Sequence, residues 1–487
     1  MKLLLNAPVF EYDIRGLLMA YYPWQKFVTD EEADDPQCLR VTYEGDTARV
    51  KGMGDVPVVL KCTLEFTDHG NTLTRDVTLD LSDKKAAKSL LKRTLYGVLG
   101  EVNGHGLPWG TLTGIRPTKI AAQMLTKGCT EREIRAHMTA ELLVSDEKTS
   151  LSIDVAKREL RLLEGIDAKD GYSLYIGIPF CPTTCLYCSF TSYPIRAYAG
   201  KTDAYIAAVC KEIDWAKEAF AGKKLNTVYF GGGTPTSIEA GQLDRLLRKV
   251  EDSFDLKHCT EWTVEAGRPD SVTEEKLRVL REHPVTRISV NPQTMHQETL
   301  DLIGRRHTVE DVLNVYAMAR RLGFGNINMD LILGLPGETP EMVRSTLEQI
   351  VRLDPDSVTV HSLAVKRAAR LNIEKAFYGH YRMENTGEAM DMCADLLGTI
   401  GLKPYYLYRQ KNMAGNLENV GYAKDGKEGV YNILIMEEVQ SILALGAGAT
   451  TKRVADGLIT RADNVKNVDL YIDSVDEMIR RKEELFR

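Results

Sequence analysis

Three cysteines lie close together in one short segment of the chain. They are Cys181, Cys185 and Cys188 of the stretch IPFCPTTCLYC, whereas the other six of the nine cysteines are scattered. Four thiolates would complete the coordination of a zinc ion or an iron-sulfur cluster, but three thiolates on a [4Fe-4S] cluster leave one iron open. The spacing therefore favours a reactive cluster. A zinc site without its fourth ligand, or three unrelated core cysteines, are the alternatives.

Further polar and glycine residues follow apolar segments later in the chain. Gly231–Gly233 and Thr234 form a turn in which a backbone without side chains can approach a ligand closely, although a tight turn alone is the alternative. Glu265, Gln293 and Asp330 end or interrupt later apolar segments and could donate or accept hydrogen bonds. A lone carboxylate at such a place is otherwise a helix cap or half of an ion pair.

Six short apolar segments alternate with amphipathic helical patterns and would position these residues. The predicted strands are Leu174–Ile178, Thr227–Phe230, Thr263–Ala266, Arg287–Val290, Ile327–Leu333 and Val358–Leu363. The intervening helical patterns are long enough for right-handed crossovers between parallel strands. We therefore expect an α/β fold with a partial (β/α)6-type barrel. The segments after the strands should hold the chemistry, because active sites of such barrels lie at the carboxyl ends of the strands.

The regions on both sides of this pattern differ from it. Residues 38–81 alternate apolar and polar residues and predict a small antiparallel sheet, after which Ser82 is expected to cap a helix. We predict three domains: an N-terminal α+β accessory domain over 1–165, the barrel over 166–382 and a mostly helical C-terminal cap over 383–487.

Composition narrows the class of protein. The chain has 487 residues, of which 44% are hydrophobic and 27% charged, as in globular proteins. Lys and Arg number 62 against 69 Asp and Glu, and the net charge of -7 argues against a nucleic acid or an acidic membrane as partner. The first residues lack the apolar region of a signal peptide, and no apolar run approaches the about 18 residues of a membrane span. We expect a cytoplasmic protein whose scattered cysteines are reduced.

The CxxxCxxC pattern after the first strand resembles the signature of the radical S-adenosylmethionine (SAM) superfamily. The resemblance implies that the open iron chelates the amino and carboxylate groups of SAM. It further implies that one electron from the reduced cluster cleaves SAM to a 5′-deoxyadenosyl radical, which abstracts a hydrogen atom from the substrate.

Six segments resemble, in order and approximate spacing, the oxygen-independent coproporphyrinogen III oxidase family. They are IPFCPTTCLYC, YFGGGTPT, RISVNPQT, GRRH, NINMDLILGLPGET and ALGAGA. The N-terminal extension, including LTGIRPTKI, resembles the longer branch of this family, often called HemZ. The resemblance implies that the cluster ligands are the three cysteines. It implies SAM contacts at Tyr175, Tyr187, Gly233, Thr234, Glu265, Gln293, Arg305, Asp330 and Ala364.

The same resemblance implies the reaction and its partners. Well-understood members remove two propionates of coproporphyrinogen III as carbon dioxide and give protoporphyrinogen IX. The implied cofactors are a [4Fe-4S] cluster and SAM, with a second SAM left open. The implied partners are a tetrapyrrole substrate and a reducing protein such as flavodoxin or ferredoxin.

Two residues depart from the well-understood members. Gly177 stands where they have a histidine, and Phe190 stands where they have a fourth cysteine after the cluster triplet. Cluster binding should survive both departures. If those side chains transfer protons or electrons in the relatives, this chain would use a different route, be less active or catalyse another tetrapyrrole reaction.

Two rival functions share this fold. A sister group of haem chaperones carries an HNxxYW motif, but residues 418–423 read ENVGYA here, without the histidine that would bind iron and without the tryptophan. A radical SAM methyltransferase that opens haem anaerobically is the other rival, and only analysis of the products separates it from the oxidase.

Two further groups of residues could contact a tetrapyrrole. Lys366, Arg367 and Arg370 follow the sixth strand and could pair with propionates, although a solvated basic helix face is the alternative. Residues 405–410 form an aromatic and polar stretch that could flank a macrocycle, and a packed strand is the alternative.

Overall fold

The computed structural model describes most of the chain in two compact units. The described residues are 1–23, 25–47, 58–114, 116–364, 366, 369–374, 378, 380, 381, 383, 385–410, 417–455 and 457–487. One unit comprises Met1–Ala156 with Tyr408–Glu418, and the other comprises Lys157–Leu407 with Asn419–Arg487. The domain boundaries near residues 165 and 382 stay predictions.

The first unit packs helices on a four-stranded sheet. The strands, in sheet order, are β1 (Lys2–Leu5), β2 (Gln37–Glu44), β3 (Val59–Asp68) and β4 (Asn71–Asp80). The predicted antiparallel sheet is confirmed over β2 to β4, and β1 adds a parallel edge. The helices are α1 (Glu11–Tyr21), α2 (Lys84–Asn103), α3 (Thr118–Thr126), α4 (Glu131–Ala136) and α5 (Asp146–Leu163), the last of which continues into the second unit.

The predicted cap of α2 is wrong by one residue. Asp83, not Ser82, accepts hydrogen bonds from the amides of Lys85 and Ala86. Ser82 lies one step earlier, where its own amide donates to Asp80. Both residue types favour this position, so the sequence alone did not distinguish them.

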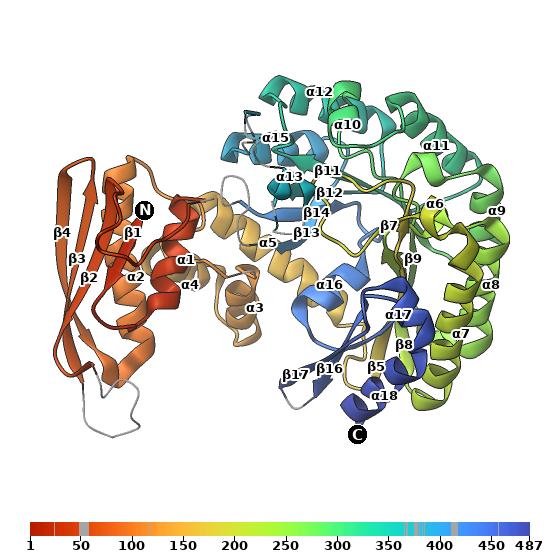
Figure 1. The fold of residues 1–487 in the computed structure, drawn as a ribbon, viewed down its shortest axis with the longest axis horizontal. Coiled ribbons are helices and arrows are strands. Elements are labelled where there is room, and N and C mark those ends of the chain that lie inside the picture. The colour runs from red at the N-terminus through yellow and green to blue at the C-terminus, as the bar shows by residue number, and fades with distance from the viewer. Residues whose placement is uncertain are drawn as a thin grey trace. The chain divides into compact units, whose positions relative to one another are not determined.

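The second unit is built on the six predicted strands, all parallel. They are β5 (Gly171–Ile178), β8 (Lys224–Gly232), β9 (Glu261–Glu265), β10 (Arg287–Ser289), β11 (Ile327–Leu333) and β12 (Ser357–Ser362). The sheet curves, and its outer face is covered by a ring of helices (Figure 1). These helices are α7 (Thr202–Ala219), α8 (Ala240–Ser253), α9 (Glu274–Glu282), α10 (Gln297–Leu302), α11 (Val309–Arg321) and α12 (Pro340–Leu353). The predicted partial barrel is confirmed.

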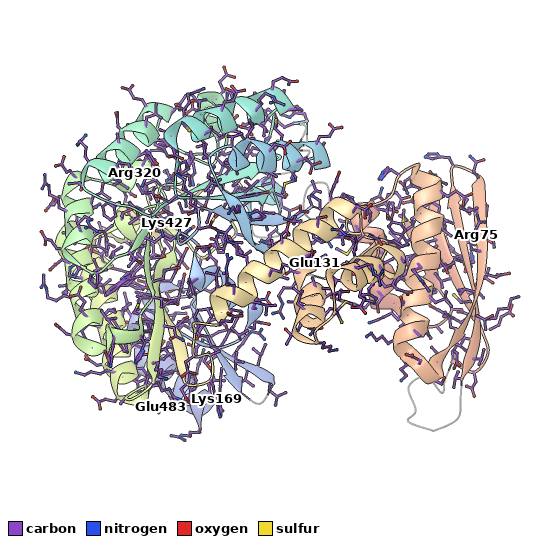
Figure 2. All side chains as sticks on the ribbon, turned by 180° about the vertical axis from the view of Figure 1, so that it is seen from behind. Arg75, Glu131, Lys169, Arg320, Lys427 and Glu483 are labelled. Carbon is purple, nitrogen blue, oxygen red and sulfur yellow. The ribbon has the colours of Figure 1, made fainter. Side chains whose placement is uncertain are left out.

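Local sequence explains why these helices lie on the sheet. On α8, Leu243, Leu246, Leu247 and Val250 are buried at helical spacing, so the helix presents one apolar face to the strands. Side chains also fix helices by charge. Arg320 of α11, labelled in Figure 2, donates to an Asp356 carboxylate oxygen at 2.6 Å, just before β12.

The C-terminal region contains the expected helices and also extends the sheet at both edges. Its helices are α15 (Gly387–Gly398), α16 (Val430–Glu437), α17 (Val468–Asp473) and α18 (Val475–Phe486). Its strands are β13 (Lys403–Tyr408), β14 (Asn419–Ala423), β15 (Ser441–Leu445), β16 (Thr450–Ala455) and β17 (Leu458–Asp463). Strand β14 pairs antiparallel with β12, and β15 pairs parallel with β5. Across the described part of the chain, we find no helix that combines the length and apolarity needed to cross a bilayer.

Candidate active site

The three clustered cysteines lie on one loop at the carboxyl end of β5. We call residues 181–190 the cysteine loop. It follows the short strand β6 (Phe180–Cys181), which pairs with β7 (Tyr193–Pro194). Within the loop, the Leu186 amide donates to the Ile303 carbonyl and the Leu186 carbonyl accepts from the Leu371 amide, both at 2.9 Å. Backbone bonds to two distant segments therefore hold the loop in place.

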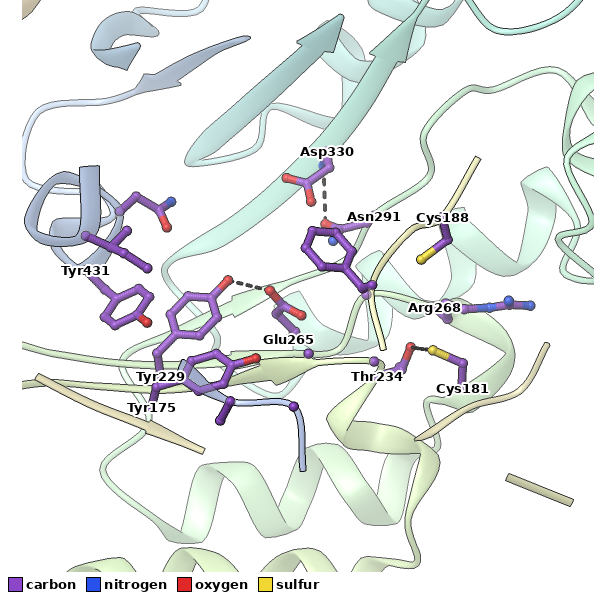
Figure 3. Close-up of a pocket in the computed structure, with 18 of the residues that line it drawn as sticks. Tyr175, Cys181, Cys188, Tyr229, Thr234, Glu265, Arg268, Asn291, Asp330 and Tyr431 are labelled. Carbon is purple, nitrogen blue, oxygen red and sulfur yellow. Dashed lines mark hydrogen bonds between the residues drawn. The ribbon is translucent and has the colours of Figure 1, made fainter. Parts of the chain in front are cut away.

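The three thiols face one cavity together. Cys181 Sγ lies 3.4 Å from Thr234 Oγ1 (Figure 3). Arg268 Nη1 lies 3.7 Å from Cys185 Sγ. Burial raises the pKa of the Cys181 thiol to about 11, so binding of iron there would release a proton. Among the described residues, no three acidic, histidine or cysteine side chains converge as a single metal ion would require. A cluster makes no such demand, because each thiolate binds a different iron.

The glycine turn lies directly against the cysteine loop. The amides of Gly233 and Thr234 donate to the carbonyls of Ile178 and Phe180 at 2.8 and 2.7 Å. Gly232 has a φ of 105°, which other residues rarely adopt, and a Cβ on Gly233 would lie 2.5 Å from the Phe180 carbonyl oxygen. The close approach of these two backbone segments requires glycine, independently of any ligand.

A cavity of about 480 Å³ opens beside the cysteines, a size typical of small-molecule sites. The structure brings together eight of the nine residues predicted to contact SAM. Its lining includes Tyr175, Tyr187, Gly233, Thr234, Glu265, Gln293, Arg305 and Asp330. Ala364 follows β12 and is not one of the described residues that line the cavity.

Aromatic rings form one wall of the cavity. Tyr229 stacks on Tyr431 with ring centroids 4.4 Å apart, and Tyr175 stacks on both at 6.1 and 6.4 Å. The Tyr229 hydroxyl donates to Glu265 Oε1 at 2.5 Å (Figure 3). Burial, together with the charge of Asp330, raises the pKa of Glu265 to about 7. The wall therefore presents a carboxyl group that titrates near neutrality.

Polar side chains that also line the cavity are held in place but have atoms without hydrogen-bond partners. The backbone N–H of Gln293 donates to the backbone carbonyl of Asp330 at 2.9 Å. Gln293 itself has a left-handed backbone conformation, with φ of 69°. Arg305 donates to the Asn291 carbonyl. Among the described residues, Gln293 Oε1 and Arg305 Nε have no hydrogen-bond partner although both side chains are buried. Since buried polar atoms normally have partners, the cavity fits a polar ligand such as SAM.

Sequence analysis missed several residues that line this cavity. Arg268 and Asn291 follow β9 and β10, where the rule on strand ends would have found them. Tyr229 lies within the strand β8 and not after its end. Tyr431 belongs to α16, which is about 200 residues further along the chain. No local signal in the sequence indicates that α16 meets β8.

The two departures from the related enzymes differ in their surroundings. A Cβ on Gly177 would lie 3.3 Å from the Leu445 carbonyl oxygen, so a larger side chain would force its neighbours to shift. Phe190 is 71% exposed and lines the cavity, and Lys366 Nζ lies 5.9 Å from the centre of its ring.

The structure also bears on the two groups of residues that could contact a tetrapyrrole, the basic residues after β12 and the stretch 405–410. Arg370 pairs with Glu374 at 3.1 Å, and Arg367 lies outside the described residues. Tyr405 and Tyr406 are 0% and 4% exposed, which supports the alternative of a packed strand.

Comparison with known proteins agrees with this geometry. Residues 175–350 match the model of the radical SAM superfamily. A structure of coproporphyrinogen III oxidase (HemN) from Escherichia coli, described as a radical SAM enzyme, superposes with a TM-score of 0.52. That match has 23% identity and covers 66% of this chain and 73% of the other. Fold and site define a radical SAM protein, a class that uses a [4Fe-4S] cluster and SAM.

Two relatives narrow the class. The oxygen-independent coproporphyrinogen-III oxidase-like protein HemZ of Bacillus subtilis is 42% identical over 84% of both chains. The chain belongs to the oxygen-independent coproporphyrinogen III oxidase family, in its longer HemZ-like branch. The heme chaperone HemW of Bacillus subtilis is also similar, with 33% identity over 63% of this chain and 76% of its own.

Proposed function

We propose that this protein converts coproporphyrinogen III to protoporphyrinogen IX by oxidative decarboxylation of two propionates. The observation that carries the proposal is that the three thiols and two buried polar side chains with unpartnered atoms, Gln293 and Arg305, line one cavity of small-molecule size. The similarity to HemZ and to the oxidase from Escherichia coli supports the choice of substrate.

Each part of the cavity has a role in this proposal. Cys181, Cys185 and Cys188 hold the cluster. When bound, the cluster and SAM supply a radical that removes a hydrogen atom from the substrate. The glycine turn, Glu265 and Asp330 bind polar groups of SAM, and Gln293 and Arg305 offer their unpartnered atoms to it. The guanidinium of Arg305 suits a carboxylate.

The tyrosine wall completes the site. Tyr175, Tyr229 and Tyr431 close one side of the cavity with stacked rings. Such a wall excludes water from the place where a reactive intermediate would be held. Because Tyr431 belongs to α16, the C-terminal region would take part in this exclusion.

The haem chaperone is the second candidate, because HemW relatives are among the similar proteins. The segment that would carry the iron-binding histidine is instead largely a buried strand, β14. Glu418, which precedes it, is fully buried and accepts a hydrogen bond from Trp109 Nε1 at 2.7 Å. The segment has no histidine, and its tyrosine, Tyr422, is buried in the strand at 3% exposure, so we favour the oxidase.

The experiment supplies coproporphyrinogen III, SAM and dithionite to anaerobically reconstituted protein. We expect carbon dioxide, protoporphyrinogen IX and 5′-deoxyadenosine. Cys185→Ala should abolish all three products, and Cys129→Ala, a change at one of the scattered cysteines, should not. Tight haem binding without turnover would contradict the proposal in favour of a chaperone, and consumption of haem would contradict it in favour of the methyltransferase.

A further inference from the structure

A second, larger cleft lies beside the cysteine loop. It has a volume of about 1170 Å³ and is lined by Pro182, Thr183 and Thr184, the three residues between the first two cysteines. Arg305 lines both this cleft and the cavity described above. The cysteine loop and one arginine therefore separate the cleft from the proposed cluster.

The cleft is basic although the chain as a whole is acidic. Five cationic side chains line it, against two carboxylates. The cations are Arg196, Lys276, Arg305, Arg306 and Arg370, and the carboxylates are Asp270 and Asp301. With a net charge of -7 over the chain, a local excess of positive charge is not an average property of this surface.

Two of these cations have no ion-pair partner among the described residues. They are Arg196 and Arg306, and both are exposed. Lys276 is largely buried, and its Nζ donates to the backbone carbonyls of Thr236 and Ser271 at 2.7 and 3.1 Å, while the Glu239 and Glu275 carboxylates act on its charge from nearby. Asp270, in contrast, is already paired with Arg268 at 2.7 Å.

Short contacts connect the cleft to the cysteines. Arg268 Nη1 donates to the Thr183 carbonyl and hydroxyl oxygens, both at 2.8 Å, and the same nitrogen lies 3.7 Å from Cys185 Sγ. The Thr183 hydroxyl donates to the Gly304 carbonyl at 2.9 Å. The surface of the cleft is thus held rigidly within two contacts of a cysteine sulfur.

An exposed apolar side chain lies on the neighbouring helix. Ile373 is 70% exposed on α13 (Arg370–Ile373), the helix whose first residue lines the cleft. A large exposed apolar side chain at the margin of a cleft that also holds the unpaired Arg196 and Arg306 is typical of a protein docking surface.

We propose that an acidic one-electron carrier protein of the flavodoxin or ferredoxin class docks over this cleft and reduces the cluster through the Thr183–Thr184 segment. The proposal rests on the proposed function, because it requires the cluster at the three cysteines. One electron leaves the carrier, which is oxidised, and enters the cluster, which is reduced, and no bond forms or breaks. The positive cleft attracts the acidic carrier and brings it against the cysteine loop.

The test compares two ways of reducing the reconstituted protein. Pre-reduced flavodoxin must dock on the protein to reduce the cluster, whereas dithionite is a small molecule that reduces it without a docking surface. The double variant Arg196→Glu/Arg306→Glu should slow bleaching of the cluster absorbance by flavodoxin by at least about tenfold at low salt and weaken flavodoxin binding similarly. Reduction by dithionite should be unchanged. Arg352→Glu, an exposed arginine in the last turn of α12 without a described partner, is the matched control and should change nothing.

A second variant, expected to accelerate reduction by flavodoxin, distinguishes a lost docking surface from a damaged cysteine loop. Asp301→Lys adds a cation at the rim and should accelerate reduction by flavodoxin. Unchanged flavodoxin rates in both variants would overturn the docking proposal alone. A slower dithionite reaction in the double variant, without acceleration by Asp301→Lys, would also overturn it. Protein that binds no cluster would instead overturn the proposed function, which a metal analysis shows separately.

Discussion

The hydroxyl of Tyr229 and the carboxyl of Glu265 share a 2.5 Å hydrogen bond in the wall of the cavity. Burial raises the pKa of Glu265 from 4.5 to about 7, and the charge of Asp330 adds to the rise, whereas the Tyr229 bond opposes it. A carboxyl group that titrates at this pH can hold or release a proton next to a bound ligand. This pair therefore links the pH of the solution to the state of the site.

Glu265→Gln should remove a pH-dependent part of stability. The folded protein binds the Glu265 proton more tightly than the unfolded chain, so wild-type stability falls as pH rises from about 4.5 to about 7. Relative to the variant, the wild type should lose at most about 3.5 kcal/mol over this window, because one pKa unit corresponds to about 1.4 kcal/mol. Denaturant unfolding of both proteins at several pH values measures the difference. A constant difference from pH 4.5 to 7.5 would contradict the prediction.

Gly233→Ala should disrupt the contact between the glycine turn and the cysteine loop. The added Cβ would lie 2.5 Å from the Phe180 carbonyl oxygen and 2.8 Å from that of Ile178, so one of the two segments must shift. We expect a loss of about 1–3 kcal/mol in stability, as for other overpacked sites, and weaker SAM binding. Thermal unfolding and a SAM titration measure both. Gly241→Ala is the control, because its Cβ would meet nothing within 4 Å. Equal behaviour of the two variants would refute the account of this turn.

Much of the second unit is predictable from local sequence. The strand Ile327–Leu333 is predicted with the bounds that the structure shows, because five of its seven residues are apolar and a turn signal follows it. The start of β9 is missed, because Glu261 is polar and looks like loop sequence. Its carboxylate is buried and accepts hydrogen bonds from the Thr263 hydroxyl and the Val430 amide. Tertiary partners of this kind, far along the chain, leave no trace in a local pattern.

The candidate site shows the same limit. Cysteine spacing and the positions after the strands place most of the lining residues, because parallel strands end at one edge of the sheet. The position of Tyr431 could not be predicted in this way. Tyr431 lies on α16, between β14 and β15, and the pairing of these strands with β12 and β5 brings it into the cavity. That pairing joins segments that are far apart in the chain.

Arg268→Gln should loosen the cysteine loop. The side chain of Arg268 is 3% exposed, pairs with Asp270 and donates twice to Thr183. Its removal leaves a partly buried carboxylate and a loop without its clamp, at a cost of about 3 kcal/mol. We also expect faster loss of cluster absorbance in air. Arg278→Gln breaks an exposed pair with Glu274 and should cost about 0.5 kcal/mol or less. Similar losses in the two variants would show that Arg268 does not hold the loop.

Lys482→Met should destabilise the second unit strongly. Lys482 Nζ lies 2.6 Å from Glu212 Oε1, and both side chains are fully buried. Without the lysine, the buried carboxylate has no counter-charge, which costs about 3–5 kcal/mol. The double variant Glu212→Gln/Lys482→Met should recover part of that loss. Chemical denaturation checks this, and a single-variant loss below about 1 kcal/mol would contradict it.

The Glu212 carboxylate also accepts a hydrogen bond from the Gly446 amide at 2.7 Å. Gly446 begins the turn that carries Gly448 to the cavity. Lys482→Met should therefore weaken SAM binding in addition to lowering stability. A SAM titration well below the unfolding temperature separates the two effects, and unchanged affinity would show that this turn is held by other contacts.

The metal content of protein purified without air tests the central claim most directly. If Cys181, Cys185 and Cys188 hold a [4Fe-4S] cluster, the protein should contain about four irons and four acid-labile sulfides per chain. Cys185→Ala should lose most of both, and Cys129→Ala should keep them. Zinc in place of iron, or wild-type protein without metal after anaerobic reconstitution, would contradict the account.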